Sequence, residues 1–523
     1  MDLRLTARLL LRRVLPGSKK RSDALWYGLP LLAAALVYCI YLKGDLYGDE
    51  LGAYQWATKG TPLLETGAPP TVFNIDIMLS RLAISVVKQP WALRVPSFIF
   101  GLLTIVMVGR LGYFLNGRRT ALISMWVAAC SPMLIEFATE GRPYTIYSFL
   151  STALLYYTLR FIRHEDVPGL LAVAASAILG CLSRTVFIAN LAFVGGLYLW
   201  KRKSRALNRY SVTVMLLVAP FIARLFLISQ HYSAYAPKTG AGEEAVSLGN
   251  FFARGVCALN FGFNLFTLPS LGLARNVPLS KVIVQNAPVA VLAAVALLGL
   301  ACACLRLLRT ERPLLVLLLC ACVIPAAVLV AIGSTGYSIV REKYLIGVLG
   351  PYAVLLGVLG NQLITRWPGR CIALAFLVVT GVSLEHYFVH PEVYSRRMLF
   401  TALNVQLNEA VSKDDMTVAY HVIRWDPWYL TFLDRADRKH VDLYDDVIQK
   451  GSNIVQYTES IDKQCPGRIF LIGDEGPRLW LDRSGQVLQV FCKDRAFHTK
   501  KFGRNLVLYI FEPLGTASGS GQP

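Results

Sequence analysis

Long apolar runs, each followed by a short polar connection, fill most of the chain up to about residue 386. A run of about 19 residues is long enough to cross roughly 30 Å of hydrocarbon as a helix. Windows of this length predict about eleven transmembrane helices. They lie near residues 25–43, 95–114, 120–138, 143–162, 168–183, 185–200, 210–229, 284–307, 313–333, 344–364 and 370–386. Because 168–183 and 185–200 are short, a hairpin that does not cross the membrane is the alternative there.

Polarity rises abruptly near residue 387, so residues 387–515 are predicted to form a separate soluble α/β domain. Short apolar runs typical of strands occur at 417–420, 468–472, 486–491 and 506–511. Helix-like stretches occur at 396–411 and 444–451. The small and polar composition of residues 516–523 predicts a disordered tail.

The positions of Lys and Arg predict the orientation. Residues 1–24 form a basic segment, and every second connection after it is basic, which the positive-inside rule assigns to the cytoplasm. The remaining connections and the domain at 387–515 are then extracytoplasmic. These connections are 44–94, 139–142, 183–184, 230–283 and 334–343. We therefore expect a multi-pass protein of the inner (plasma) membrane, with a cytoplasmic N-terminus.

Composition agrees with this assignment. The 523 residues are 55% hydrophobic and only 16% charged, with a mean hydropathy of +0.48, whereas soluble domains carry about 25% charged residues. The net charge of +20 is spread over short loops that flank the spans, which argues against a nucleic-acid partner.

The 11 cysteines show no ligand spacing typical of a metal site. Cys302, Cys304, Cys320 and Cys322 lie in apolar runs, where cysteine packs as a small apolar residue. Cys465 and Cys492 could form a disulfide if their domain faces an oxidising compartment.

An acidic pair, Asp49-Glu50, follows the first predicted span. Carboxylates near hydrocarbon are costly, so they usually serve chemistry or ion pairing. The spacing after Glu50 suits a helix lying along the membrane surface, with Asp49 near its start. The competing interpretation is that Asp49 only caps this helix and Glu50 is a first-turn acid.

Three cations stand on the predicted outer side. Arg142 lies in Glu140-Gly141-Arg142-Pro143-Tyr144, and Arg341 and Lys343 lie before the tenth predicted span. Because the positive-inside rule disfavours cations on this side, they indicate an anionic partner such as a phosphate. The competing interpretation is snorkelling, or pairing with Glu140 and Glu342.

The order of these motifs resembles the GT-C glycosyltransferases. The resemblance rests on Asp49-Glu50, on Arg-Val-Pro-Ser-Phe-Ile-Phe-Gly-Leu-Leu-Thr at 94–104, on Glu-Gly-Arg-Pro-Tyr at 140–144 and on Arg-Glu-Lys-Tyr-Leu at 341–345. It is greatest for the branch that holds protein O-mannosyltransferases and lipid A aminoarabinose transferases. It is strongest over residues 25–165 and thinner over 166–386. The chain departs from the family at Ala68-Pro69-Pro70, where a Lys often precedes the prolines.

The resemblance implies an inverting transfer of one sugar from a polyprenyl-phosphate carrier to a lipid, glycan or protein acceptor at the extracytoplasmic face. Such a reaction needs a base for the acceptor proton and cations for the departing phosphate. We assign the base to Asp49, with Glu50 in reserve or as an orienting group. Arg142, Arg341 and Lys343 would then bind the phosphate.

The remaining candidates are residues that would orient the sugar or acceptor and a loop that could cover the active site. Glu140, Tyr144, Tyr54 and Trp56 would orient the sugar or acceptor, although the aromatic residues also suit interfacial anchors. Residues 230–283 would form either a mobile cover or a linker. We expect no metal and no other cofactor, although Asp49, Glu140 and a third acid could share a divalent ion. The rival classes are a transporter or flippase and a non-catalytic scaffold of a polysaccharide assembly system.

Overall fold

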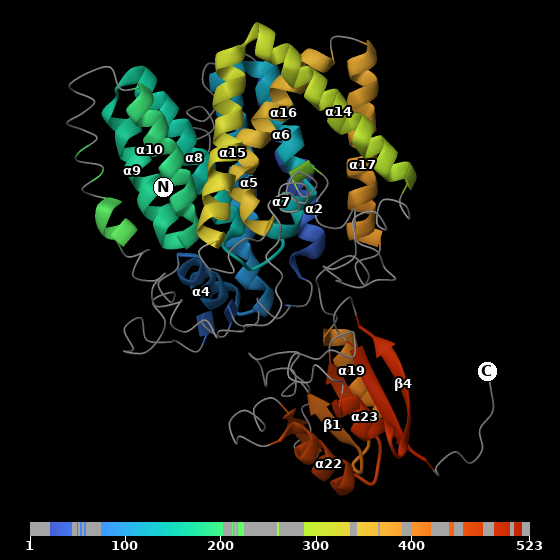
Figure 1. Ribbon diagram of the computed structural model, residues 1–523. Coiled ribbons are helices and arrows are strands. Elements are labelled where there is room, and N and C mark those ends of the chain that lie inside the picture. The colour runs from blue at the N-terminus through green and yellow to red at the C-terminus, as the bar shows by residue number, and fades with distance from the viewer. Residues whose placement is uncertain are drawn as a thin grey trace. The chain divides into compact units, whose positions relative to one another are not determined.

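The computed structural model shows a helical unit and a smaller unit that contains a sheet (Figure 1). It describes residues 21–43, 46, 50, 53–54, 57–58, 75–201, 212, 215, 218–223, 259–260, 287–334, 342–364, 367–389, 400–419, 439–443, 453–473, 486–502 and 507–514. The predictions for 1–20, for most of 230–283, for 444–451 and for the tail 516–523 fall outside these residues.

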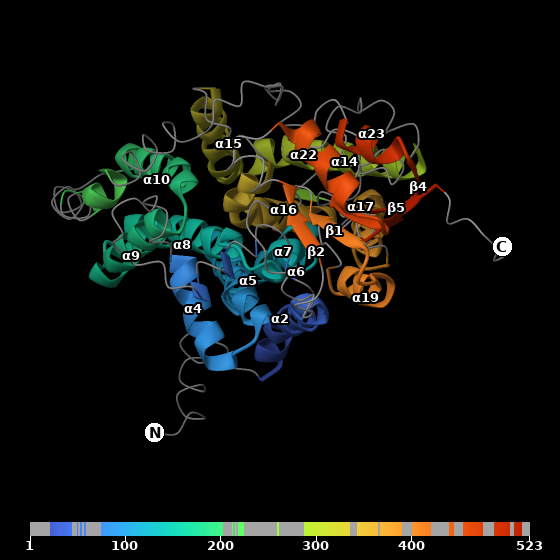
Figure 2. The ribbon, with the colours of Figure 1, turned by 90° about the horizontal axis from the view of Figure 1, so that it is seen from below.

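The helical unit holds the first fifteen elements. They are α2 (Arg21–Leu42), α4 (Ile75–Val87), η2 (Pro90–Arg94), α5 (Val95–Asn116), α6 (Arg118–Ala129), α7 (Pro132–Ala138), α8 (Tyr144–His164), α9 (Val167–Ser183), η3 (Thr185–Phe187), α10 (Ile188–Lys201), α14 (Ala287–Thr310), α15 (Arg312–Ser334), η4 (Glu342–Val348), α16 (Leu349–Leu363) and α17 (Trp367–Val389). Within it, α5, α6, α8 and α16 pack on one another, and α8, α9 and α10 lie side by side (Figure 2).

Five helices in the described part of the chain are long and apolar enough to cross a membrane, or six if one bent pair counts as a single span. Three shorter apolar helices, Trp26–Leu42, Val167–Ser183 and Thr185–Tyr198, coincide with further predicted spans. The chain is therefore a helical protein with several candidate spans, and the number eleven stays a prediction.

The span predicted over 120–138 consists of two helices and not of one continuous helix. Helices α6 and α7 are separated by Cys130-Ser131 and bent by 59°. Pro132 has no N–H to donate to the preceding turn, and the Ser131 hydroxyl accepts a hydrogen bond from the backbone N–H of Leu134 at 3.4 Å. A new helix therefore starts at Pro132 in a new direction.

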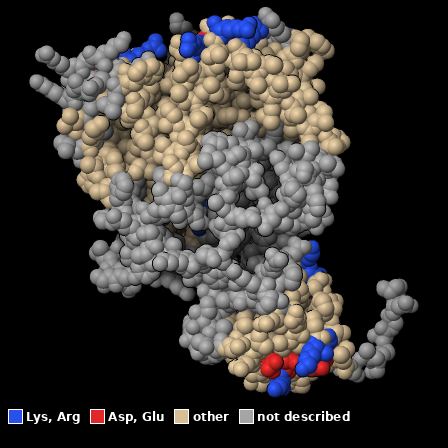
Figure 3. Space-filling model, in the orientation of Figure 1, with Lys and Arg blue, Asp and Glu red and all other residues tan. Residues whose placement is uncertain are grey.

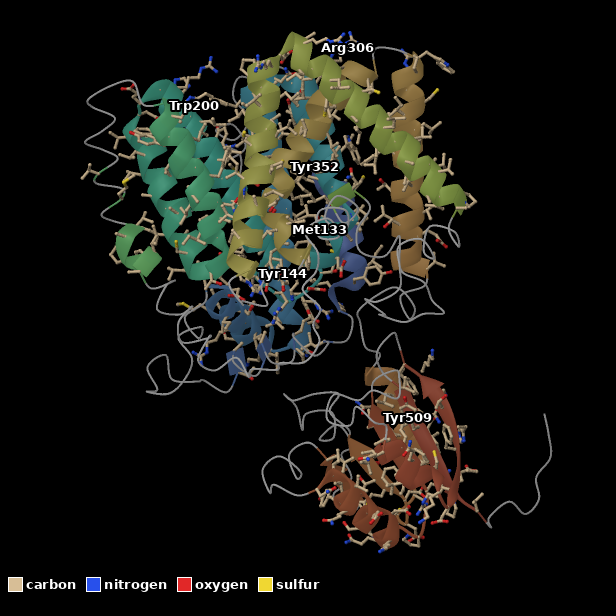
Figure 4. The ribbon with its side chains drawn as sticks, viewed as in Figure 1. Met133, Tyr144, Trp200, Arg306, Tyr352 and Tyr509 are labelled. Atoms are coloured by element: carbon tan, nitrogen blue, oxygen red, sulfur yellow. The ribbon has the colours of Figure 1, made fainter. Side chains whose placement is uncertain are left out.

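The two ends of the helical unit differ in charge. Lys and Arg side chains gather at the end where α14 meets α15, while the described flanks show few charged side chains (Figure 3). This end carries Arg306, and Tyr144 lies at the opposite end (Figure 4). The amide of Asn116, at the end of α5, donates to the Glu311 carboxylate at 3.1 Å. The ends of α5 and α14 are thus joined at the basic end.

At the opposite end, the short helix η4 packs closely on α8. A Cβ atom on Gly347 would lie 2.3 Å from the Tyr147 ring, and one on Gly350, at the start of α16, would lie 2.0 Å from the Thr152 hydroxyl. Only glycine permits this approach, because it has no Cβ atom. The contact places residue 343 against the start of α8.

The second unit contains a five-stranded mixed sheet in the order β2-β1-β3-β5-β4. Strands β1, β2 and β3 are parallel, and β5 runs antiparallel to both β3 and β4. Its core includes Val418, Leu471, Phe491 and Phe511. The elements are α19 (Phe400–Ala410), β1 (Met416–Ala419), β2 (Lys439–Asp442), α22 (Ile454–Gln464), β3 (Ile469–Gly473), α23 (Gln486–Cys492), β4 (Arg495–Lys501) and β5 (Val507–Pro513).

The prediction of a strand at 486–491 is wrong, because these residues form helix α23. Val487 and Phe491 are fully buried, and their spacing of four residues places both on one face of a helix. A short apolar run does not distinguish this pattern from a buried strand.

Polar contacts fix the edge of this unit where β1 begins. Arg468 pairs with Asp415 at 2.9 Å, and the Ser412 hydroxyl donates to the same carboxylate at 2.8 Å. Burial alone would raise the pKa of Asp415, but these hydrogen bonds hold it below its ordinary value. Cys465 and Cys492 border the same core and are free thiols.

Candidate functional site

The aromatic ring of Tyr144 is the centre of a cationic cluster in the helical unit. Arg184 Cζ lies 4.8 Å from the ring centroid, Lys343 Nζ lies at 5.5 Å and Arg142 Cζ at 5.9 Å. Tyr144 is 1% exposed and Lys343 is 8% exposed. A cation within about 6 Å of an aromatic face is stabilised by the ring. One buried ring therefore holds three positive charges together.

Three separate segments deliver these cations. Arg142 lies in the turn before α8, Arg184 lies between α9 and η3, and Lys343 lies in η4. The turn at Arg142 is fixed by the Ser97 hydroxyl, which donates to the Arg142 carbonyl at 2.8 Å. Arg184 is fixed by its own N–H, which donates to the Gly180 carbonyl at 3.1 Å.

The Arg94–Ser97 segment contacts both the end of α2 and the turn that carries Arg142. The guanidinium of the fully buried Arg94 donates to the carbonyls of Tyr41 and Leu42, both at 3.2 Å. These are carbonyls of the last turn of α2, which have no partner within their own helix. The motif therefore ties the end of α2 to the turn that carries Arg142.

The cluster also includes a carboxylate, Asp76, in the first turn of α4. Helix α4 contacts η2, α5 and α9, and the Ser80 hydroxyl donates to the Leu93 carbonyl at 3.3 Å. Burial raises the pKa of Asp76, while the charges of Arg184 and Arg142 act in the opposite direction. The net pKa is raised, so burial outweighs the two arginines.

The structure brings together Arg142, Lys343 and Tyr144 from the predicted set, and Glu140 is buried in the same turn as Arg142. Glu50 is fully buried and Tyr54 half-buried in the second unit, where burial raises the pKa of the Tyr54 phenol. Asp49, Trp56 and Arg341 lie outside the described residues.

Two residues of the cluster, Arg184 and Asp76, were absent from the predicted site. Arg184 was placed on the outer side but interpreted only as part of a hairpin. Its position as a charge between two apolar runs, on the side disfavoured for cations, is the signal that could have identified it. Asp76 lies in an amphipathic stretch where one acid is unremarkable, so only the fold reveals its neighbours.

Among the described residues, no three His, Cys, Asp or Glu side chains are arranged to hold a metal ion. The described part of the cluster is instead rich in donors. Guanidinium and ammonium groups suit an oxygen-rich anion, and arginine presents paired N–H donors that match a phosphate.

The family profile of dolichyl-phosphate-mannose-protein mannosyltransferases matches residues 71–228. ArnT from Cupriavidus metallidurans, in the apo state, is similar over 95% of this chain and 99% of its own, with 13% identity and a TM-score of 0.52. At this identity the similarity shows a shared fold. The profile match includes Asp76, Arg142 and Arg184, and Lys343 lies beyond it.

Other solved GT-C structures show weaker similarity. The Archaeoglobus fulgidus oligosaccharyltransferase, in the apo form, is 12% identical over 91% of this chain and 73% of its own, with a TM-score of 0.48. Arabinofuranosyltransferase AftD from Mycobacteria is 13% identical over 95% of this chain and 40% of its own, with a TM-score of 0.43. The comparison with curated proteins found no match.

Proposed function

We propose that this protein is an inverting glycosyltransferase that moves one sugar from a polyprenyl-phosphate carrier to an acceptor at the extracytoplasmic membrane face. The observation that carries the proposal is the cluster of Arg142, Arg184 and Lys343 around Tyr144, at the end of the helical unit opposite the basic end. The match of residues 71–228 to the mannosyltransferase profile supports a transferase in preference to a transporter or scaffold.

The cluster suits the leaving group of this reaction. As the bond between the anomeric carbon and the phosphate oxygen breaks, negative charge grows on the phosphate. Fixed cations in a water-poor site stabilise that charge more strongly than water does. Arg142 and Arg184 would bind the phosphate through their N–H donors and Lys343 as a point charge. Arg341 stays a fourth candidate. ArnT from Cupriavidus metallidurans has also been solved with bound undecaprenyl phosphate.

The base is assigned from the sequence. In the proposed step an acceptor oxygen attacks the anomeric carbon, its proton passes to the carboxylate of Asp49, and the polyprenyl phosphate leaves. Glu50 is the reserve candidate for the base. Glu140, Tyr54, Trp56 and Tyr144 are proposed to orient the sugar or acceptor. The proposed step needs no metal ion, because the cationic side chains can stabilise the negative charge on the phosphate.

The proposed reaction fixes a topology. The N-terminus would be cytoplasmic, the sheet-containing unit extracytoplasmic, and the protein a multi-pass component of the inner or plasma membrane. The polyprenyl chain would remain in hydrocarbon while its phosphate reaches the interface.

The test compares cells that carry the wild-type protein with cells that carry Asp49→Asn. Loss of a general base is expected to slow transfer by roughly 100-fold to 10,000-fold. Lipid-linked sugars should accumulate and the glycosylated acceptor should disappear, both measured by mass spectrometry. The purified variant should still bind undecaprenyl phosphate. Unchanged glycans in these cells would favour a scaffold, and loss of lipid translocation without loss of transfer in vitro would favour a flippase.

A further inference from the structure

Asp76 offers a hydrogen-bond acceptor that the described structure leaves unused. The residue is 9% exposed, and its buried Oδ1 atom has no hydrogen-bond partner among the described residues. A buried acceptor without a partner destabilises a protein by about 1–3 kcal/mol. At a binding site, a ligand can supply the missing donor.

The surroundings of Asp76 identify the part of the ligand that could do so. Arg184 and Arg142 act electrostatically on this carboxylate and also flank the Tyr144 ring, so Asp76 borders the proposed phosphate site. A phosphate that links a lipid to a sugar has only acceptor oxygens and carries a negative charge. It can neither donate to Oδ1 nor approach it favourably.

The group next to the phosphate in the proposed donor is the sugar, whose hydroxyls are donors. The oxygens of a carboxyl group accept hydrogen bonds from hydroxyls. We propose that Asp76 binds a hydroxyl of the donor sugar through Oδ1, and so distinguishes the sugar-charged carrier from the bare polyprenyl phosphate. This role rests on the proposed function.

The local structure fixes the direction of this acceptor. Asp76 lies in the first turn of α4, where free backbone N–H groups favour a carboxylate. The middle of α4 is tied to η2 by Ser80, and Arg81 donates to the Ala57 carbonyl at 3.2 Å. The carboxylate is therefore held by a helix that is fixed at several points.

The experiment measures the binding of two lipids to the full-length protein by competition in native mass spectrometry. The probes are undecaprenyl phosphate and the lipid-linked sugar extracted from cells that carry Asp49→Asn. The variants are Asp76→Ala, which removes the acceptor, and Asp76→Asn, which keeps a neutral one. Asp166→Ala is the matched control, because Asp166 pairs with Arg160 at 2.7 Å beyond the far end of α8.

The wild-type protein should prefer the sugar-charged lipid. Asp76→Ala should reduce that preference by about 10-fold or more, since a lost hydrogen bond to a charged group has about this effect. Asp76→Asn should reduce it less, and Asp166→Ala should leave it unchanged. Both Asp76 variants should bind undecaprenyl phosphate at least as well as the wild type, because a negative charge beside the phosphate has been removed.

Two results would overturn this role. If Asp76→Ala weakened the binding of both lipids equally, Asp76 would only hold the arginines in place or stabilise the fold. An unchanged preference would mean that no sugar hydroxyl contacts it. If the wild-type protein bound neither lipid, the proposed function itself would fail, and this role would fail with it.

Discussion

Arg184 has the shortest distance to the Tyr144 ring among the three cations, and it reaches the cluster from the short connection between α9 and η3. Two roles are conceivable for such a residue: it could bind a ligand, or it could only pack on the ring. The two roles differ in what its replacement does to binding of an anion, because packing alone would leave phosphate affinity intact.

We expect Arg184→Gln to weaken binding of undecaprenyl phosphate by about 10-fold or more, since hydrogen bonds to charged groups contribute about 1.5–3 kcal/mol. The measurement is titration of the purified protein followed by native mass spectrometry. Arg306→Gln is the control, because Arg306 is an exposed arginine at the opposite end of the unit. Equal affinities of Arg184→Gln and the control would exclude Arg184 from the phosphate site.

The individual site residues were only partly predictable. Arg142 and Lys343 were identifiable because each is a cation on the side where cations are rare. The same rule applied to Arg184, but its hairpin of two short apolar runs concealed that α9 and α8 pack together. Asp76 was not predictable, since its significance comes from the neighbours that the fold supplies.

The packing of η4 on α8 decides whether Lys343 reaches Tyr144. Gly347 permits this packing, since a Cβ atom there would lie 2.3 Å from the ring of the buried Tyr147. That ring is also held by Asn190, whose amide donates to the Tyr147 hydroxyl at 2.9 Å. The ring cannot move aside without losing this bond, so η4 would have to move instead.

We therefore expect Gly347→Ala to destabilise the protein by about 1–3 kcal/mol through overpacking and to displace Lys343 from the cluster. Thermal unfolding and binding of undecaprenyl phosphate should both be impaired. Gly381→Ala in α17 is the matched control, because a Cβ atom there meets nothing within 4 Å. Wild-type stability of Gly347→Ala would contradict the close packing of η4 on α8.

The secondary-structure elements were predicted best where one long apolar run corresponds to one helix. The apolar runs near 95–114, 284–307 and 313–333 correspond to α5, α14 and α15. The predictions differ from the structure where a local sequence signal interrupts or changes the pattern of an apolar run. Ser131 and Pro132 divide the run 120–138, and the helical spacing of Val487 and Phe491 overrides the strand assigned to 486–491.

The two ends of the helical unit differ in charge, and this difference predicts how the unit is oriented in the membrane. Helix α5 runs from η2, at the site end, to Asn116, which hydrogen-bonds to Glu311 at the basic end. The positive-inside rule assigns the basic end to the cytoplasm. The cationic cluster would then face the extracytoplasmic side, where the proposed donor presents its phosphate.

Labelling of single cysteines would test this orientation. In a variant without native cysteines, Gln89→Cys and Thr310→Cys each place a thiol at an exposed position, one at the site end and one at the basic end. In sealed right-side-out vesicles, a membrane-impermeant maleimide should label Gln89→Cys only. Thr310→Cys should react only after detergent is added, because the bilayer separates it from the reagent. The opposite pattern would place the cationic cluster in the cytoplasm, where it could not serve an extracytoplasmic transfer.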